Sequence, residues 1–215
     1  MARPRSDIEP RIVNAARRRF LEQGVHGASL RTIARDAGTS IGMVYYYFPT
    51  KDDLFFAVVE EVYAKILSDM ARALEPNAPV EERIHRIYTR IGALSDAELV
   101  TVQLVVREAL VSSSRFRRLL ARFQRGHIPL VLGALADGVR EGSVDGALPA
   151  PLLLLATLSI GAVPQFVRRA AGKRAPFSDL PSGEAFAEIL VRVLFHGIGA
   201  AGRKPAEAHE GASRG

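Results

Sequence analysis

The chain has 215 residues, of which 48% are hydrophobic and 24% are charged, and its formal net charge is +6. These values are ordinary for a protein that buries its own hydrophobic core, and the length allows one or two domains. The chain has no cysteine, which excludes disulfide bonds, a thiol nucleophile and a thiolate metal site.

Three short helices are predicted in the first 50 residues. The first has apolar residues at spacings of three and four and stops at Gly24. The second starts after Ser29 and the third after Ser40, because a serine at these places can cap free N–H groups. Gly38 lies in the turn between them, and Pro49 ends the third helix. The residues predicted to face inward are Ile12, Ala15, Ala16 and Phe20; Leu30, Ile33, Ala34 and Ala37; and Ile41, Val44 and Phe48.

A fourth, longer helix is predicted from Thr50 to Leu74. Thr50 and Asp53 have the spacing of a capping box, in which each side chain bonds the backbone N–H of the other residue. Two prolines between residues 75 and 79 end the helix, so we place a domain boundary there. Its predicted inward stripe consists of Leu54, Val58, Val62, Ile66 and Met70.

The rest of the chain also has helical periodicity, so the predicted fold class is all-α. The helix at 97–112 is apolar on almost all sides, which predicts a central place in the core. Pro129 predicts a break within residues 115–141, because proline disrupts a helix interior. The tail from Arg203 is small and polar, and we expect it to be disordered. The remaining helices are predicted near residues 84–94, 149–171 and 182–199.

The most apolar stretch runs from Leu152 to Val163. As a helix it would span about 18 Å at ~1.5 Å per residue, whereas the core of a bilayer is about 30 Å thick. The N-terminus is polar and lacks the apolar run of a signal peptide. We therefore expect a buried helix in a cytoplasmic protein without a membrane partner.

Three consecutive tyrosines, Tyr45, Tyr46 and Tyr47, give the strongest functional signal. Adjacent residues on a helix point about 100° apart, so the three rings cannot all be buried on one face. Gly42 lies just before them and allows close approach of another backbone. Two helices joined by a glycine-containing turn are typical of units that place the second helix in the DNA major groove. Lys51 at the start of the next helix is a candidate phosphate anchor.

Residues 8–66 resemble the TetR family of bacterial transcriptional regulators. The resemblance implies an N-terminal three-helix helix-turn-helix domain and a C-terminal helical bundle for ligand binding and dimerisation. The implied divisions are 1–50 for DNA binding, a connecting helix from 50 to about 74, 75–202 for effector binding and dimerisation, and a tail at 203–215. The residues that carry the resemblance are Ile12, Ala15, Ala16, Phe20 and Gly24; Ser29-Leu30-Arg31-Thr32-Ile33-Ala34 with Ala37-Gly38; and the run from Ser40 to Leu54.

The resemblance also implies which residues contact DNA. Met43 and Tyr46 match positions that reach base edges. Tyr45 and Tyr47 match positions that touch the phosphates or thymine methyl groups, and Lys51 matches a phosphate contact. Tyr47 stands where the family often has histidine, and the apolar Met43 favours thymine methyl groups over hydrogen bonds. The complete implied set is Ser29, Thr32, Thr39, Ser40, Gly42, Met43, Tyr45, Tyr46, Tyr47 and Lys51.

Four polar residues that interrupt the apolar helices of the second domain are candidate ligand-binding residues: Gln103, Arg107, His127 and Gln165. A buried polar group needs a partner, so these residues either pair within the chain or await a ligand in a mostly apolar pocket. The histidines lack metal-ligand spacing, and no catalytic triad or phosphate-cradling loop is present. No catalytic residue, metal or cofactor is therefore predicted, and the chain is not expected to be an enzyme.

The predicted function is a homodimeric repressor that binds a palindromic operator in double-stranded DNA and is released by a small apolar ligand. Two alternatives stay open. One is a regulator of the same fold that is controlled by a protein partner or acts as an activator, and the other is a small helical enzyme or lipid-binding module. The apolar residues expected at the dimer interface are Leu152, Leu155, Leu158, Ala162, Phe166, Phe186, Ile189 and Val193.

Overall fold

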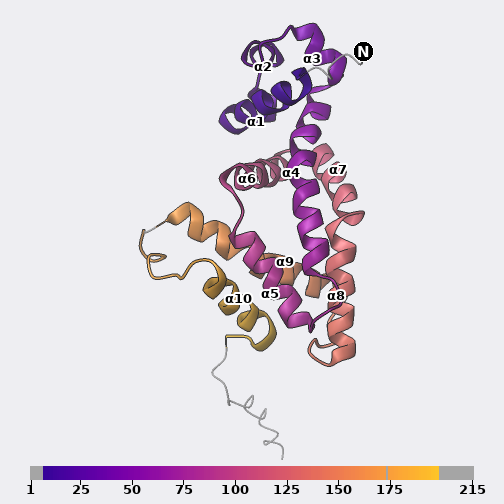
Figure 1. Ribbon diagram of the computed structural model, residues 1–215, viewed down its shortest axis with the longest axis vertical. Coiled ribbons are helices and arrows are strands. Elements are labelled where there is room, and N and C mark those ends of the chain that lie inside the picture. The colour runs from indigo at the N-terminus through magenta and orange to yellow at the C-terminus, as the bar shows by residue number, and fades with distance from the viewer. Residues whose placement is uncertain (1–6, 173, 199–215) are drawn as a thin grey trace, which may run out of the picture.

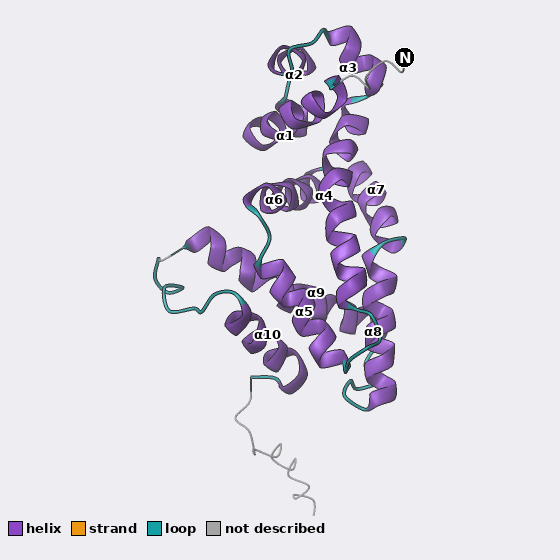
Figure 2. Cartoon of the chain, viewed as in Figure 1, coloured by secondary structure: helices purple, strands orange, loops and turns teal. Residues whose placement is uncertain are grey.

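The computed structural model describes residues 7–172 and 174–198, and every regular element within these ranges is a helix (Figures 1 and 2). The fold is all-α, as predicted. The predicted tail at 203–215 lies outside the described residues. In chain order the helices are α1 (Ile8–Gly27), α2 (Leu30–Asp36), α3 (Ile41–Tyr47), α4 (Lys51–Ala73), α5 (Val80–Gly92), α6 (Asp96–Val111), α7 (Ser113–Gln124), α8 (His127–Glu141), α9 (Ala150–Ala171) and α10 (Glu184–His196).

Helices α1, α2 and α3 form one end of the molecule, and α4 runs from them into the rest of the chain (Figure 1). Thr50 and Asp53 form the predicted capping box, in which Thr50 Oγ1 accepts from the Asp53 N–H at 3.1 Å. The backbone leaves helical geometry at Gly24, whose φ of 75° lies in the left-handed region. Helices α2, α3 and α4 begin directly after Ser29, Ser40 and Thr50, as predicted. The caps by Ser40 and Thr50 are confirmed, whereas the Ser29 side chain makes no capping hydrogen bond. Ile41 is 36% exposed, however, so its predicted inward position is wrong.

Two clusters of buried side chains hold the molecule together. The first joins α1–α4 and also contains Leu104 from α6 and Leu119 from α7. The second joins the far end of α4 to α5, α8 and α10, with α9 packed against it. The first three helices are thus fixed by α6 and α7 as well as by their covalent link to α4.

Helix α6 reverses the expected burial pattern. Val106, Leu110 and Val111 are 50%, 84% and 73% exposed, whereas Thr101 and Glu108 are buried. The prediction of a central apolar helix is therefore wrong. The physical reason is that α6 packs on α1, α4 and α7 through a face whose buried polar groups are paired. Glu108 accepts from the Val25 N–H of α1, and Thr101 donates to the Ala97 carbonyl within α6.

The predicted break in residues 115–141 occurs before the proline. The chain leaves helical geometry at Arg125 and Gly126, between α7 and α8. Pro129 then lies in the first turn of α8, where its missing N–H is not needed for the helical ladder.

Helix α9 differs from the expected buried helix. It has 22 residues and is long and apolar enough to cross a membrane by length and composition, yet only 17% of its most apolar window is buried in the chain. Leu152, Leu155 and Val163 are more than half exposed. The prediction failed because the apolar run was assigned to an internal core, whereas only one face of α9 packs within the chain. That face holds Thr157, Gly161 and Gln165.

Candidate DNA-binding surface and ligand cavity

Helices α2 and α3 meet at a tight turn that requires glycine. Gly38 has a φ of 63°, a conformation that residues with a Cβ rarely adopt. The Thr39 N–H donates to the Ala34 carbonyl at 3.0 Å, which closes the turn. One face of α3 is then buried through Val44, and the opposite face is open to solvent.

The open face of α3 presents aromatic rings. Tyr46 is 77% exposed and Tyr45 is 53% exposed, while the half-buried Tyr47 packs edge-on against Tyr46 with 5.3 Å between ring centroids. Gly42 lies on the same open surface, and a Cβ there would meet only Ser40 Oγ, at 3.7 Å. Glycine costs up to about 1 kcal/mol in a helix relative to alanine. Because the chain has room for a side chain at this place, close approach from outside the chain explains the glycine.

Four hydroxyl side chains lie on α2 or just before α2 and α3. Ser29 and Ser40 are exposed, and Thr32 and Thr39 are half-buried. Ser40 Oγ accepts from the Met43 N–H at 3.3 Å, which leaves its hydroxyl proton for another acceptor. The surface therefore offers the short polar donors that contact phosphate oxygens.

Lys51 follows α3 directly and has one bond within the chain. Its Nζ donates to the His26 carbonyl at 3.1 Å, and an ammonium group has two further donors for a phosphate. The neighbouring Asp52 is held by Arg115, with 2.9 Å between Nη2 and Oδ1. This ion pair offsets the negative charge of Asp52 beside Lys51, which favours an anion there.

The N-terminal helices match a known family. Residues 12–58 match the family described as bacterial regulatory proteins, tetR family. The chain is a TetR-family transcriptional regulator. It binds DNA through the helix-turn-helix of α2 and α3, and this family consists of regulators rather than enzymes.

Relatives of the regulator match beyond this unit. The HTH-type transcriptional regulator BetI from Rhizobium meliloti is 29% identical over 177 residues, which cover 74% of this chain and 87% of BetI. The fatty acid metabolism regulator protein from Bacillus subtilis is 25% identical over 140 residues, covering 64% of this chain and 71% of that protein. The crystal structure of FadR from Bacillus subtilis in complex with stearoyl-CoA has a TM-score of 0.69 at 19% identity, over 88% of this chain and 99% of FadR. The C-terminal helices therefore share the fold of TetR-family structures.

A second site lies behind the DNA-binding helices. An apolar cavity of about 270 Å³ is lined by side chains of α4, α5, α6, α7, α8 and α9. Its size is near the lower end of small-molecule pockets, which measure roughly 300–1,000 Å³. Tyr63, Thr101 and His127 are the lining residues whose side chains carry nitrogen or oxygen.

Tyr63 and His127 are bonded twice in the wall of this cavity. The Tyr63 hydroxyl lies 3.0 Å from His127 Nδ1 and accepts from the His127 backbone N–H at 3.2 Å. Gly126 makes this approach possible, because a Cβ there would lie 2.0 Å from the Tyr63 hydroxyl oxygen. Burial, followed by the positive charge of Arg122, lowers the pKa of His127 to about 4. The imidazole is therefore neutral at physiological pH.

Only one of the four polar residues predicted to bind a ligand lines the cavity, and it is His127. Gln103 is exposed on α6. Arg107 turns to α1, where its guanidinium donates to the carbonyl groups of Phe20 and Leu21, the latter at 3.1 Å.

Gln165 has partners in the contact between α5 and α9. Its amide nitrogen donates to the Tyr88 carbonyl at 2.7 Å and to the Gly161 carbonyl at 2.8 Å. Both Arg107 and Gln165 therefore follow the pairing alternative that the sequence left open. Tyr63 was not singled out from the sequence, because its partner His127 is 64 positions away. Gly126 beside His127 was the available signal.

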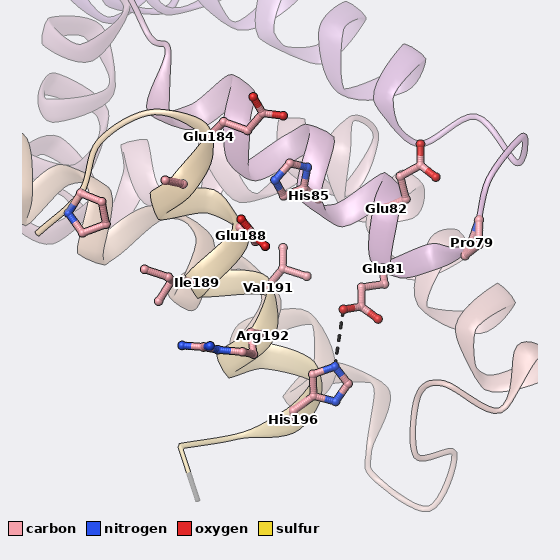
Figure 3. Close-up of a pocket in the computed structure, with 12 residues that line it drawn as sticks. Pro79, Glu81, Glu82, His85, Glu184, Glu188, Ile189, Val191, Arg192 and His196 are labelled. Carbon is pink, nitrogen blue, oxygen red and sulfur yellow. Dashed lines mark ion pairs between the residues drawn. The ribbon is translucent and has the colours of Figure 1, made fainter. Parts of the chain in front are cut away.

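A larger hollow of about 1,040 Å³ lies at the surface between α5 and α10 (Figure 3). Four carboxylates line it, and Glu81 and His196 point toward one another across it, 3.5 Å apart. Both of these side chains are substantially exposed, so the groups in this hollow are hydrated and screened. The smaller, apolar cavity is the better candidate for a small ligand because it removes the ligand from water.

Proposed function

We propose that the chain is a homodimeric repressor in the bacterial cytoplasm that leaves a palindromic operator when a small apolar ligand enters the cavity. The position of the cavity carries this proposal, because its wall includes both α4 and α6. Helix α4 begins at Lys51, directly after α3, and α6 packs on α1. In this arrangement residues 1–50 bind DNA, residues 75–202 together with α4 hold the ligand, and residues 75–202 also bind the second subunit.

Side chains near the end of α6 form hydrogen bonds with the backbone of α1 around its kink at Gly24. Glu108 Oε1 accepts from the Val25 N–H at 3.2 Å, just after Gly24 interrupts the helix. Arg107 donates to the last carbonyl groups before the kink, at Phe20 and Leu21. Two adjacent side chains of α6 thus satisfy backbone groups that the interrupted helix leaves free. A shift of α6 would change the position of α1 and, through α2, the position of the recognition helix α3.

The same contact continues into α4 and α7. Arg115 on α7 donates to Glu108 Oε2 at 2.7 Å and through Nε to Asp52 Oδ1 at 3.0 Å. Glu108 and Arg115 are both buried, so separating them would leave an unpaired charge away from water. This network favours movement of α4, α6 and α7 as a unit over independent movement of each helix.

A ligand weakens operator binding only if it favours a conformation with wrongly spaced DNA-binding helices. A typical coupling of about 1–3 kcal/mol lowers operator affinity roughly 5- to 150-fold. The solved relative FadR carries stearoyl-CoA, and the apolar lining found here suits an acyl or aromatic group in the same way.

The test is fluorescence anisotropy with labelled DNA from upstream of the regulator's own gene, with and without butylbenzene as an apolar probe. We expect specific, salt-sensitive binding that butylbenzene weakens about 5-fold or more. Ala162→Leu adds volume to the cavity lining and should abolish the probe's effect. Butylbenzene that binds in calorimetry yet leaves operator affinity unchanged would contradict ligand release and favour control by a protein partner.

The exposed face of α9 is the proposed dimer interface. Its inner face fits closely on α5, since a Cβ at Gly161 would lie 2.1 Å from the Tyr88 ring. The outer face presents Leu152, Leu155 and Val163 to solvent. A membrane-spanning helix would need to be apolar on every side facing lipid, whereas α9 has one packed face and one free face, which suits a second copy of the chain.

This interface differs in part from the set predicted from sequence. Leu158, Ala162 and Phe166 line the cavity, and Phe186 is buried inside the chain. Leu155→Glu should therefore give monomers with weak operator binding. Leu110→Glu, at an exposed position on α6, is the matched control and should remain dimeric in light scattering. A dimeric Leu155→Glu variant would place the interface elsewhere.

A further inference from the structure

The hydrogen-bonding groups of the cavity indicate which chemistry the ligand must have. This inference rests on the proposed function, since it concerns the ligand of the same cavity. Three lining side chains carry nitrogen or oxygen, namely Tyr63, Thr101 and His127. Each of these groups can donate to a ligand only if its proton is not already donated within the chain.

The Tyr63 hydroxyl proton is committed. The phenol oxygen accepts from the His127 backbone N–H at 3.2 Å, and the other hydrogen-bond contact of this hydroxyl among the described residues is His127 Nδ1, at 3.0 Å. We therefore assign the hydroxyl proton to that contact, which makes Nδ1 the acceptor. A neutral imidazole with an unprotonated Nδ1 carries its proton on Nε2.

The Thr101 hydroxyl is committed as well. Its Oγ1 donates to the Ala97 carbonyl at 3.0 Å, one turn earlier in α6. His127 Nε2–H has no hydrogen-bond partner among the residues that the structure describes. The lining therefore has one uncommitted side-chain donor.

The lining also has no charged side chain. Arg122 lies over the Tyr63 ring, 4.5 Å from its centroid, but it is outside the lining and its Nε and Nη2 bind the carboxylate of Glu60 at 2.9 and 2.6 Å. A carboxylate or ammonium group in the cavity would have no counter-charge and would lose its hydration. An uncharged ligand avoids this cost.

We propose that the cavity selects an uncharged, hydrophobic carbonyl compound whose oxygen accepts a hydrogen bond from His127 Nε2–H. A ketone, ester or aldehyde oxygen supplies the missing acceptor, and the hydrocarbon remainder fills the apolar wall. A hydrocarbon of the same shape binds the cavity but leaves this donor without a partner. A carboxylate of the same shape is excluded because its charge has no partner.

The test uses three matched probes, 4-phenylbutan-2-one, butylbenzene and 4-phenylbutanoate, in titration calorimetry with the full chain. Two substitutions separate the ring nitrogens. His127→Asn places an amide oxygen near the Nδ1 position, where Tyr63 can still donate, but removes the Nε2–H donor. His127→Gln places an amide N–H near the Nε2 position. His85→Asn, on α5 outside the cavity, is the matched control.

A net hydrogen bond is worth about 0.5–1.5 kcal/mol, or roughly 2- to 10-fold in affinity. His127→Asn should weaken the ketone by this factor and leave butylbenzene unchanged, whereas His127→Gln should keep most of the ketone affinity. The carboxylate should bind at least about 10-fold more weakly than the ketone. Circular dichroism and thermal melts identify a variant that has not folded.

The outcomes separate the two proposals. Equal changes for ketone and butylbenzene in His127→Asn would overturn the role of His127 while leaving a ligand-binding cavity in place. Tight binding of the carboxylate would overturn the selection for uncharged ligands. If none of the three probes bound the wild-type chain, both the carbonyl proposal and the cavity's role in release would fail.

Discussion

The neutral, half-buried His127 should make the fold sensitive to mild acid. Its pKa of about 4 in the folded chain lies below the value of ~6.5 for an exposed histidine. The unfolded chain therefore binds the proton more tightly. The stabilisation is fully present above about pH 6.5 and is lost as the pH falls toward 4. The groups that face the ring are the Tyr63 hydroxyl, which bonds Nδ1, and the cation of Arg122, which also opposes protonation.

Between about pH 7.5 and about pH 5.5, this linkage removes roughly 1 kcal/mol of stability. For a chain of this size that corresponds to about 2–4 °C in Tm. Other groups titrate over the same interval, so the measured quantity is the difference between wild type and His127→Asn in differential scanning fluorimetry at both pH values. We expect the Tm of wild type to fall further than that of the variant by this amount. Equal falls would mean that His127 is not held neutral by burial.

Three further expectations follow from particular contacts. Gly126→Ala should destabilise the fold by about 1–3 kcal/mol, because the methyl group displaces the Tyr63 hydroxyl. The control Gly133→Ala, which has open space around it, should be neutral or stabilising by up to about 1 kcal/mol. Urea unfolding measures both free energies, and equal costs would argue against crowding at Gly126. Glu108→Gln should lower the free energy of unfolding by about 1–3 kcal/mol in the same assay and reduce the effect of butylbenzene on operator binding. An unchanged effect of butylbenzene would mean that the contact between Glu108 and α1 has no part in release. Lys51→Ala should lower the affinity for all DNA sequences alike and reduce the slope of log affinity against log salt concentration by about one. Tyr46→Ala should instead cost roughly 1–3 kcal/mol of binding free energy on the operator alone. Wild-type affinity in both variants would mean that the DNA contacts lie elsewhere.

The helix-turn-helix could be predicted from sequence because its signals are local. Ser29, Ser40 and Thr50 each precede a helix by one residue, and Gly38 is needed where the backbone turns left-handed. Each signal acts within four residues, so it does not depend on how the rest of the chain folds. Helix geometry also predicted that the three tyrosine rings cannot all be buried, and Tyr45 and Tyr46 are exposed.

The cavity and its polar groups were harder to predict because they depend on contacts between distant residues. Periodicity gives the apolar face of a helix but not whether that face meets the core, a cavity or a second subunit. Leu155 and Leu158 belong to the same apolar run, yet the first is exposed and the second lines the cavity. In the same way, Arg107 and His127 are both polar residues within apolar helices. Only their partners in the structure show that Arg107 contacts α1, whereas His127 lines the cavity as the proposed ligand donor.

In the proposed release mechanism, the short distance between the cavity and the α1 kink would let a small ligand move a whole helix. Val105 lines the cavity and Glu108 binds Val25, and three residues of helix separate them by about 4.5 Å at ~1.5 Å per residue. A helix transmits a displacement over that length almost unchanged, because its hydrogen bonds resist compression. The bond from the Val25 N–H to Glu108 is already 3.2 Å long, so a further movement of about 0.5–1 Å would break it. Because contacts of this kind are either made or broken, the proposed mechanism predicts two positions for α1 rather than a continuous range.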